Sequence, residues 1–298
     1  MIWSHVWNRV ALLAAGMLLG WNLPHYWAAP RDRRRDYALR LAIGALLGIA
    51  LIVPLALANP ASALVGLLVI AFCALVAYAG NARQLLKAPL EPPYLAPENR
   101  SSWTALTTIF LVSAGEPLTY DGPAPWAAYM RYRASRAQAT PHWLVFARTC
   151  GRVRQAYAQM GGSSPAAAAL QTLADDLHAR LGEHAAIHVH TIWSANSLAG
   201  HLRRALADGC REIVLVPLGL EEAAQEQLRE AATASRVREA GVAVRFTPNF
   251  DLSPWLGADD ERLDQLWQGH TVAVPEGPGQ ALVANLAAVL DAHHLETR

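Results

Sequence analysis

The chain has 298 residues, of which 53% are apolar and only 16% are charged. Soluble domains carry charge on roughly a quarter of their residues, so this composition argues against an ordinary soluble protein. The formal net charge of +1 leaves no global field to attract nucleic acid. The imbalance is local: residues 1–80 are nearly free of charge outside one basic cluster, whereas the later part has the composition of a soluble domain.

An N-terminal apolar segment, residues 10–29, has two interpretations. Arg9 precedes it, Pro24 and His25 fall near its end, and tryptophans flank it as in an aromatic belt. The segment either crosses a bilayer or lies in the membrane interface. We expect no cleaved signal peptide, because a basic leader is lacking and Pro30 stands where cleavage would occur.

Two further apolar segments are long enough to cross a bilayer. Residues 61–80 contain no charged side chain, and a helix of this length spans a hydrocarbon core of about 30 Å. Residues 41–57 are nearly as apolar, and Pro54 is tolerable in a membrane helix. A short turn around Asn59 joins the segments. The sequence therefore predicts a transmembrane module over residues 1–86, with two or three helices at about 10–29, 38–58 and 61–82.

The basic residues predict the orientation of this module. The turn between the last two helices contains no basic residue. The basic residues on either side of this pair of helices are Arg31, Arg33, Arg34, Arg35, Arg40, Arg83 and Lys87. The positive-inside rule places both flanks in the cytoplasm. We therefore expect a multi-pass protein of the cell inner (cytoplasmic) membrane, with the bilayer as its first partner. A linker with four prolines, residues 87–102, leads to a cytoplasmic domain over residues 103–298.

In this domain, strand-like apolar runs alternate with helical segments. We expect strands at residues 105–112, 186–193, 212–217, 242–247 and, as a short fifth, 271–274. We expect helices at residues 126–137, 142–160, 166–181, 198–208, 221–240, 256–268 and 280–293. Such alternation predicts a three-layer α/β domain with a mostly parallel sheet of four or five strands. Because ligands bind outside the carboxyl ends of such strands, three loops matter most: residues 113–121, 193–197 and 218–222.

Four motifs between residues 109 and 254 follow one another in a familiar order. The first strand ends in Ser113-Ala114-Gly115-Glu116-Pro117, and the Tyr/Arg-rich helix Ala128-Tyr129-Met130-Arg131-Tyr132-Arg133 follows. Next comes Tyr157-Ala158-Gln159-Met160-Gly161-Gly162-Ser163-Ser164-Pro165, and finally the helix and strand of residues 205–218. The series resembles the N-terminal half of ferrochelatases, which insert ferrous iron into porphyrin, and its G-G-x-S-P element is the most specific. The resemblance implies one flavodoxin-like half of that fold, a haem or porphyrin ligand, and iron as the substrate metal.

One position departs from the family pattern. The resemblance implies a catalytic histidine after the strand at residues 212–217, but Leu218 stands there, and residues 259–298 are too few for the family's second half. Metal insertion needs a base for the pyrrole protons and ligands for the metal, and leucine supplies neither. The resemblance thus implies tetrapyrrole binding more strongly than lyase activity. Activity would require a homodimer in which His190 or Glu221 replaces the base.

The resemblance also implies a set of tetrapyrrole-binding residues. These are Ser113, Gly115, Pro117, Tyr129, Arg131, Arg133, Gly161, Gly162, Ser163, Trp193 and Leu218. The arginines would pair with propionates, and the first loop would form a wall of the site. The alternatives are an ordinary tight turn for the loop and a solvated helix face for the arginines.

Two pairs of residues are candidates for metal binding or catalysis. His188 and His190 share one face of a strand, as a metal pair would need. The alternative is that they sit under a covering helix or at a sheet edge. Glu221 and Glu222 could supply oxygen ligands or a base, or could be only a favourable acidic first turn of a helix. No firm metal site follows.

Three functional hypotheses remain open. The first is a membrane-anchored, half-length ferrochelatase-like protein that binds a tetrapyrrole at the cytoplasmic membrane face. The second is a catalytically inactive accessory subunit of a membrane complex, with close helix packing at Gly44, Gly48, Ser62 and Gly66. The third is an unrelated flavodoxin-like domain in which the G-G-S-S-P match is chance.

Overall fold

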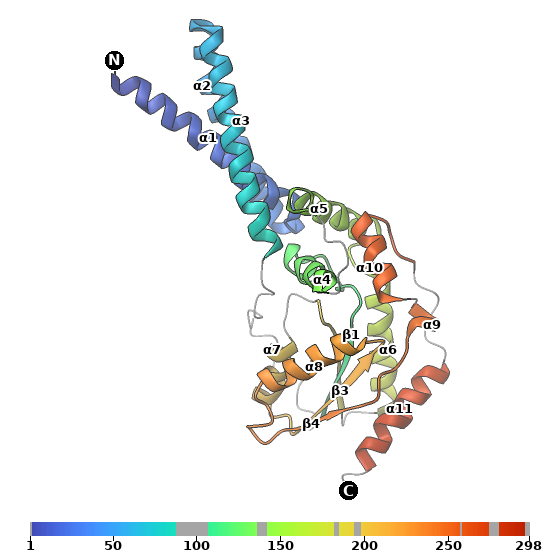
Figure 1. Cartoon of the computed structure of the whole chain (residues 1–298). Coiled ribbons are helices and arrows are strands. Elements are labelled where there is room, and N and C mark those ends of the chain that lie inside the picture. The colour runs from blue at the N-terminus through green and yellow to red at the C-terminus, as the bar shows by residue number, and fades with distance from the viewer. Residues whose placement is uncertain are drawn as a thin grey trace. The chain divides into compact units, whose positions relative to one another are not determined.

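The computed structural model describes residues 2–87, 107–135, 142–181, 185–193, 198–256, 258–273 and 280–295 (Figure 1). The chain divides into two compact units. Unit 1 combines Met1–Pro89 with Asp121–Gln155, and unit 2 combines Leu90–Tyr120 with Ala156–Arg298. Each unit is described by itself below.

Unit 1 begins with three long helices, α1 (Ile2–Ala28), α2 (Arg31–Ala58) and α3 (Pro60–Leu86). Among the described residues, α2 and α3 are the two helices long and apolar enough to cross a membrane. The other helix, α1, is of similar length but is not in this class, and it contains Asn22, Pro24 and His25 near its end. The predicted helical hairpin is present, joined at Asn59, whose side chain accepts a hydrogen bond from the Ala61 amide at 3.0 Å.

Glycines set the spacing of these three helices. A Cβ atom on Gly20 would lie 2.0 Å from the Ala74 carbonyl oxygen, and one on Gly16 would lie 2.6 Å from that of Ile70. The two glycines are four residues apart, so they bring one face of α1 against the backbone of α3. Gly44 and Gly66 also lie at contacts between helices, as expected, whereas Ser62 is exposed.

Two further helices, α4 (Pro123–Ser135) and α5 (Trp143–Gln159), follow later in the chain. Arg154 donates hydrogen bonds to the carbonyls of Trp27 and Ala29 at 3.0 and 2.8 Å. Arg131 donates to the Leu86 carbonyl at 3.0 Å. These bonds explain why residues 121–155 cluster with the N-terminal helices, a division that differs from the expected boundary at the linker. Residues 88–102 of that linker lie outside the described part.

Unit 2 contains a parallel four-stranded sheet in the order β2-β1-β3-β4. The strands are β1 (Thr107–Ser113), β2 (Ala185–Thr191), β3 (Glu212–Leu218) and β4 (Ala243–Phe246). The predicted α/β class and parallel sheet are thus confirmed. The expected fifth strand is not formed at residues 271–273, and residue 274 lies outside the described part.

Helices cover both faces of this sheet. Alternate residues of β1 point to opposite sides, so Ile109 and Leu111 pack in one core with α6 (Pro165–Leu181), α9 (Ser253–Leu256) and α11 (Gln280–Leu295). Phe110 and Val112 pack in the other with α7 (Leu198–Ala207) and α8 (Glu222–Ala234). Figure 1 shows the strands between these helix layers. The result is the three-layer arrangement that the alternation of elements predicts.

Several element boundaries differ from expectation. Helix α8 ends at Ala234 rather than near residue 240, and Arg236 follows with a left-handed φ of 58°. The single helix expected at residues 256–268 is instead α9 and the separate α10 (Asp259–Gln268). The expected cap before α6 is present, because the Ser164 hydroxyl accepts a hydrogen bond from the Ala167 amide at 3.2 Å.

Candidate functional site

The strand order creates a switch point at the carboxyl edge of the sheet. The chain leaves β1 and packs α6 on one face, and it leaves β3 and packs α8 on the other. Ser113 and Leu218, the last residues of these two strands, pair in register. Such switch points are where ligands bind in open α/β sheets, so the loops around them define the candidate site.

The loop after β1 folds against the loop before α6. Tyr157 donates a hydrogen bond from its hydroxyl to the Pro117 carbonyl at 2.7 Å. The Ser164 amide donates to the Leu118 carbonyl at 2.8 Å, and Thr119 forms an antiparallel bridge with Ser163. We call residues 113–120 and 161–164 together the loop pair. Two motifs about 50 residues apart in sequence, S-A-G-E-P and G-G-S-S-P, are thus neighbours in space.

A buried ion pair connects the loop pair to α10. Glu116, only 1% exposed, accepts from Arg262 of α10 at 3.3 Å and from the Ser164 hydroxyl at 2.7 Å. The guanidinium also donates to the Leu256 carbonyl at 2.6 Å. Burial of a charge is costly unless it is paired and hydrogen-bonded, and here each partner is. Sequence reasoning missed this pair, since nothing in the polar helix around Arg262 points to a partner 146 residues away.

Five predicted binding residues are buried in the loop pair or next to it. Ser113, Gly115, Pro117 and Leu218 are buried. Trp193 is also buried, and its indole N–H donates to the Ala114 carbonyl at 2.6 Å. These residues hold the edge together and are not open to solvent.

Other residues form the solvent-exposed surface of the loop pair, which we call its rim. Leu118 is 46% exposed, Thr119 and Gly161 are exposed, and Gly162 and Ser163 are partly so. Gly161 and Gly162 have φ values of +84° and +99°, and a Cβ on either would meet nothing within 4 Å. A ligand at this edge would therefore meet an open backbone and the leucine side chain.

The Tyr/Arg-rich motif lies in α4 and belongs to unit 1. Tyr129 is buried against Trp126, with ring centroids 6.3 Å apart, and the Arg133 guanidinium lies 5.8 Å from the Tyr129 ring centroid. Arg131 donates to the end of α3, as described above. These three predicted residues are thus in a different compact unit from the loop pair.

The two histidines lie on β2, an edge strand of the sheet, and His190 packs against α7, which agrees with the alternative interpretation. The His190 ring is 5.3 Å from that of His201 on α7, and the His188 ring is 5.5 Å from that of Phe110. Burial, with His201 as a second cause, lowers the pKa of His190 to about 3 and that of His188 to about 4. Both imidazoles are therefore neutral at neutral pH.

The remaining candidates offer no assembled ligand set. Glu221 and Glu222 are exposed where α8 begins, which fits the acidic first turn of a helix. Within the described residues, no group of three or more His, Cys, Asp or Glu side chains is placed to hold a metal ion.

Comparisons with known proteins identify no relative: no family model, no curated protein and no solved structure matches the chain.

Proposed function

We propose that the chain is a membrane protein in which α2 and α3 cross the bilayer and carry a cytoplasmic α/β unit. The observation that carries this proposal is the apolar surface of the two helices. Leu57 is 84% exposed and Phe72 is 67% exposed, and many of their neighbours are similar. An apolar surface of this extent is unstable in water but is satisfied by lipid. The basic flanks of the hairpin favour the cytoplasmic side for both of its ends.

The ligand that we propose for the α/β unit is a tetrapyrrole, bound at the rim of the loop pair. The contact between the S-A-G-E-P and G-G-S-S-P segments supports this proposal, since a shared site requires the two motifs to meet. The strand order supports a flavodoxin-like sheet. The open glycine backbone at Gly161 and Gly162 would let a flat macrocycle approach closely.

Binding without metal insertion fits these residues best. Insertion requires an accessible base, but Leu218 stands at the position of the family histidine, and His190 is only 5% exposed beneath α7. Glu221 and Glu222 are exposed carboxylates after β3, and a homodimer would be needed for them to complete a site. We therefore propose a tetrapyrrole carrier or sensor at the membrane face.

The test is a titration of the full chain, in detergent or nanodiscs, with haem and with protoporphyrin. We expect a saturating shift of the main absorbance band at micromolar protein. The Leu118→Gln variant should bind several-fold more weakly, because it replaces the exposed apolar side chain of the rim. Leu144→Gln on α5 is the matched control, since Leu144 is 40% exposed but lies in unit 1. If neither haem nor protoporphyrin shows a shift of its absorbance band, the proposal is contradicted.

Predicted binding residues at the carboxyl ends of the strands, among them Ser113, Pro117 and Leu218, are buried. Their burial favours a second candidate, a catalytically inactive accessory subunit of a membrane complex. In that case the exposed surfaces of α2 and α3 would contact another membrane protein. Purification in a mild detergent would then yield a stoichiometric partner, and the same titration would show no tetrapyrrole binding.

A further inference from the structure

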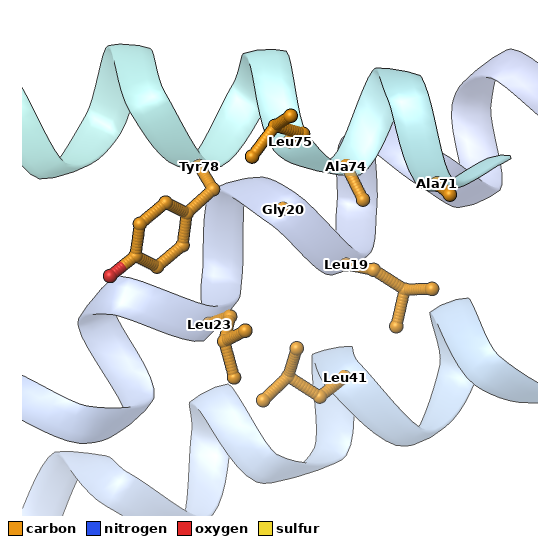
Figure 2. Close-up of a pocket in the computed structure, with 8 residues that line it drawn as sticks. All are labelled: Leu19, Gly20, Leu23, Leu41, Ala71, Ala74, Leu75 and Tyr78. Carbon is orange, nitrogen blue, oxygen red and sulfur yellow. The ribbon is translucent and has the colours of Figure 1, made fainter. Parts of the chain in front are cut away.

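An apolar groove lies where α1, α2 and α3 meet in unit 1. Its volume is about 460 Å³, and its walls include Leu19, Leu23, Leu41, Ala71, Leu75 and Tyr78. Figure 2 shows Leu23 of α1 and Leu41 of α2 pointing toward one another, with Ala71, Ala74 and Leu75 on α3. This volume falls in the range of about 300–1,000 Å³ that small-molecule sites occupy.

The chemistry of the groove is that of a hydrocarbon site. Its lining is aliphatic apart from Tyr78, whose hydroxyl donates a hydrogen bond to the Leu144 carbonyl and is thereby satisfied. Leu75 is 60% exposed, so the groove is reached from the outer surface of α3. An apolar chain that entered it would leave no polar group of the protein unpaired.

The groove lies at the basic end of the hairpin. Leu41 directly follows Arg40 near the start of α2, and Tyr78 precedes Arg83 near the end of α3. An aromatic stack ties Arg40 to this end: its guanidinium is 5.5 Å from the Tyr37 ring centroid, and that ring stacks at 5.0 Å on His25, two residues after Leu23. Arginine suits phosphate groups particularly well, because its guanidinium can donate two hydrogen bonds at once.

We propose that this groove holds one acyl chain of an anionic phospholipid whose phosphate pairs with Arg40. Charge complementarity argues for an anionic rather than a zwitterionic lipid, since basic sites at the cytoplasmic ends of membrane helices attract such headgroups. The site rests on the proposal that α2 and α3 span the bilayer, and it is independent of tetrapyrrole binding.

The test is a titration of the full chain in detergent with phosphatidylglycerol and with phosphatidylcholine of identical acyl chains, followed by native mass spectrometry. We expect at least a five-fold preference for phosphatidylglycerol. Arg40→Gln should abolish the preference, whereas Arg35→Gln, which removes an exposed charge of the same cluster, should leave most of it. Ala71→Phe should fill the groove and lower binding at least five-fold, whereas Ala50→Phe, on an exposed face of α2, should not.

Equal binding of the two lipids would overturn the proposal, as would equal effects of Ala71→Phe and Ala50→Phe. If Ala71→Phe loses the helical circular dichroism of the wild type, the Arg40→Gln and Arg35→Gln comparison decides alone. Extraction of membranes at alkaline pH separates the two proposals. Release of the chain would contradict membrane spanning itself, and retention without lipid preference would contradict only the groove site.

Discussion

Glu116 and Arg262 give the clearest test at the scale of single residues, because their ion pair is buried. Arg262→Ala would leave the Glu116 carboxylate without its cation in the core, which costs about 3–5 kcal/mol. Arg229→Ala is the matched control, since its ion pair with Glu226 is 3.1 Å long but exposed, and such pairs contribute about 1 kcal/mol or less. Hydrogen exchange of peptides from β1 and α6 measures how much protection each variant loses. Equal loss of protection in both variants would contradict the assigned role.

The two histidines of β2 predict a pH dependence. Their pKa values are about 4 and about 3 in the folded chain, below the value of about 6.5 in an unfolded chain. The unfolded chain therefore binds more protons below pH 6.5, and stability falls as the pH drops through this range by up to about 1.4 kcal/mol per unit for each histidine. His201 lies 5.3 Å from the His190 ring and is the second cause, after burial, that lowers both pKa values.

Hydrogen exchange of β2 and α7 peptides between pH 7 and pH 5, corrected for the intrinsic exchange rate, measures this slope. His190→Phe keeps an aromatic ring under α7 and should flatten the dependence. An unchanged slope in that variant would show that other groups cause it.

At the scale of elements, the packing of α1 on α3 depends on Gly20. Gly20→Ala would place a methyl group 2.0 Å from the Ala74 carbonyl oxygen, so the two backbones must separate at a cost of about 1–3 kcal/mol. The midpoint of thermal unfolding in detergent should fall by several degrees. Gly80→Ala on α3 should not lower it, because a Cβ there meets nothing within 4 Å and alanine favours a helix over glycine. Similar midpoints for the two variants would argue against close packing at Gly20.

The elements themselves were largely predictable from sequence. The apolar runs at β1 and β3 and the Ser164-Pro165 start of α6 are local signals, and the structure confirms them. The association of α4 and α5 with the N-terminal helices was not predictable, because it depends on Arg154 meeting carbonyls more than a hundred residues earlier. The Glu116–Arg262 pair was missed for the same physical reason.

At the scale of the whole molecule, the basic flanks of the hairpin predict its orientation. The variant in which Arg31, Arg33, Arg34 and Arg35 become Gln, with six lysines inserted after Asn59, should reverse the hairpin. The turn side then has six basic residues, whereas the flanks keep three, Arg40, Arg83 and Lys87. A C-terminal alkaline phosphatase fusion would report this change, since the enzyme is active only outside the cytoplasm. Activity in the unaltered chain would contradict a cytoplasmic α/β unit.

The hydrogen bonds of Arg154 have a consequence for biosynthesis. The carbonyls that they satisfy, at the end of α1, belong to residues made 125 and 127 positions earlier. At roughly 5–20 residues per second, the ribosome needs about 6–25 s to supply this arginine after α1 has emerged. During that interval the nascent α1 must rely on water, lipid headgroups or a chaperone to solvate its last turn. Unit 1 therefore completes its folding only after the whole of the segment that interrupts it, Leu90–Tyr120, has been translated.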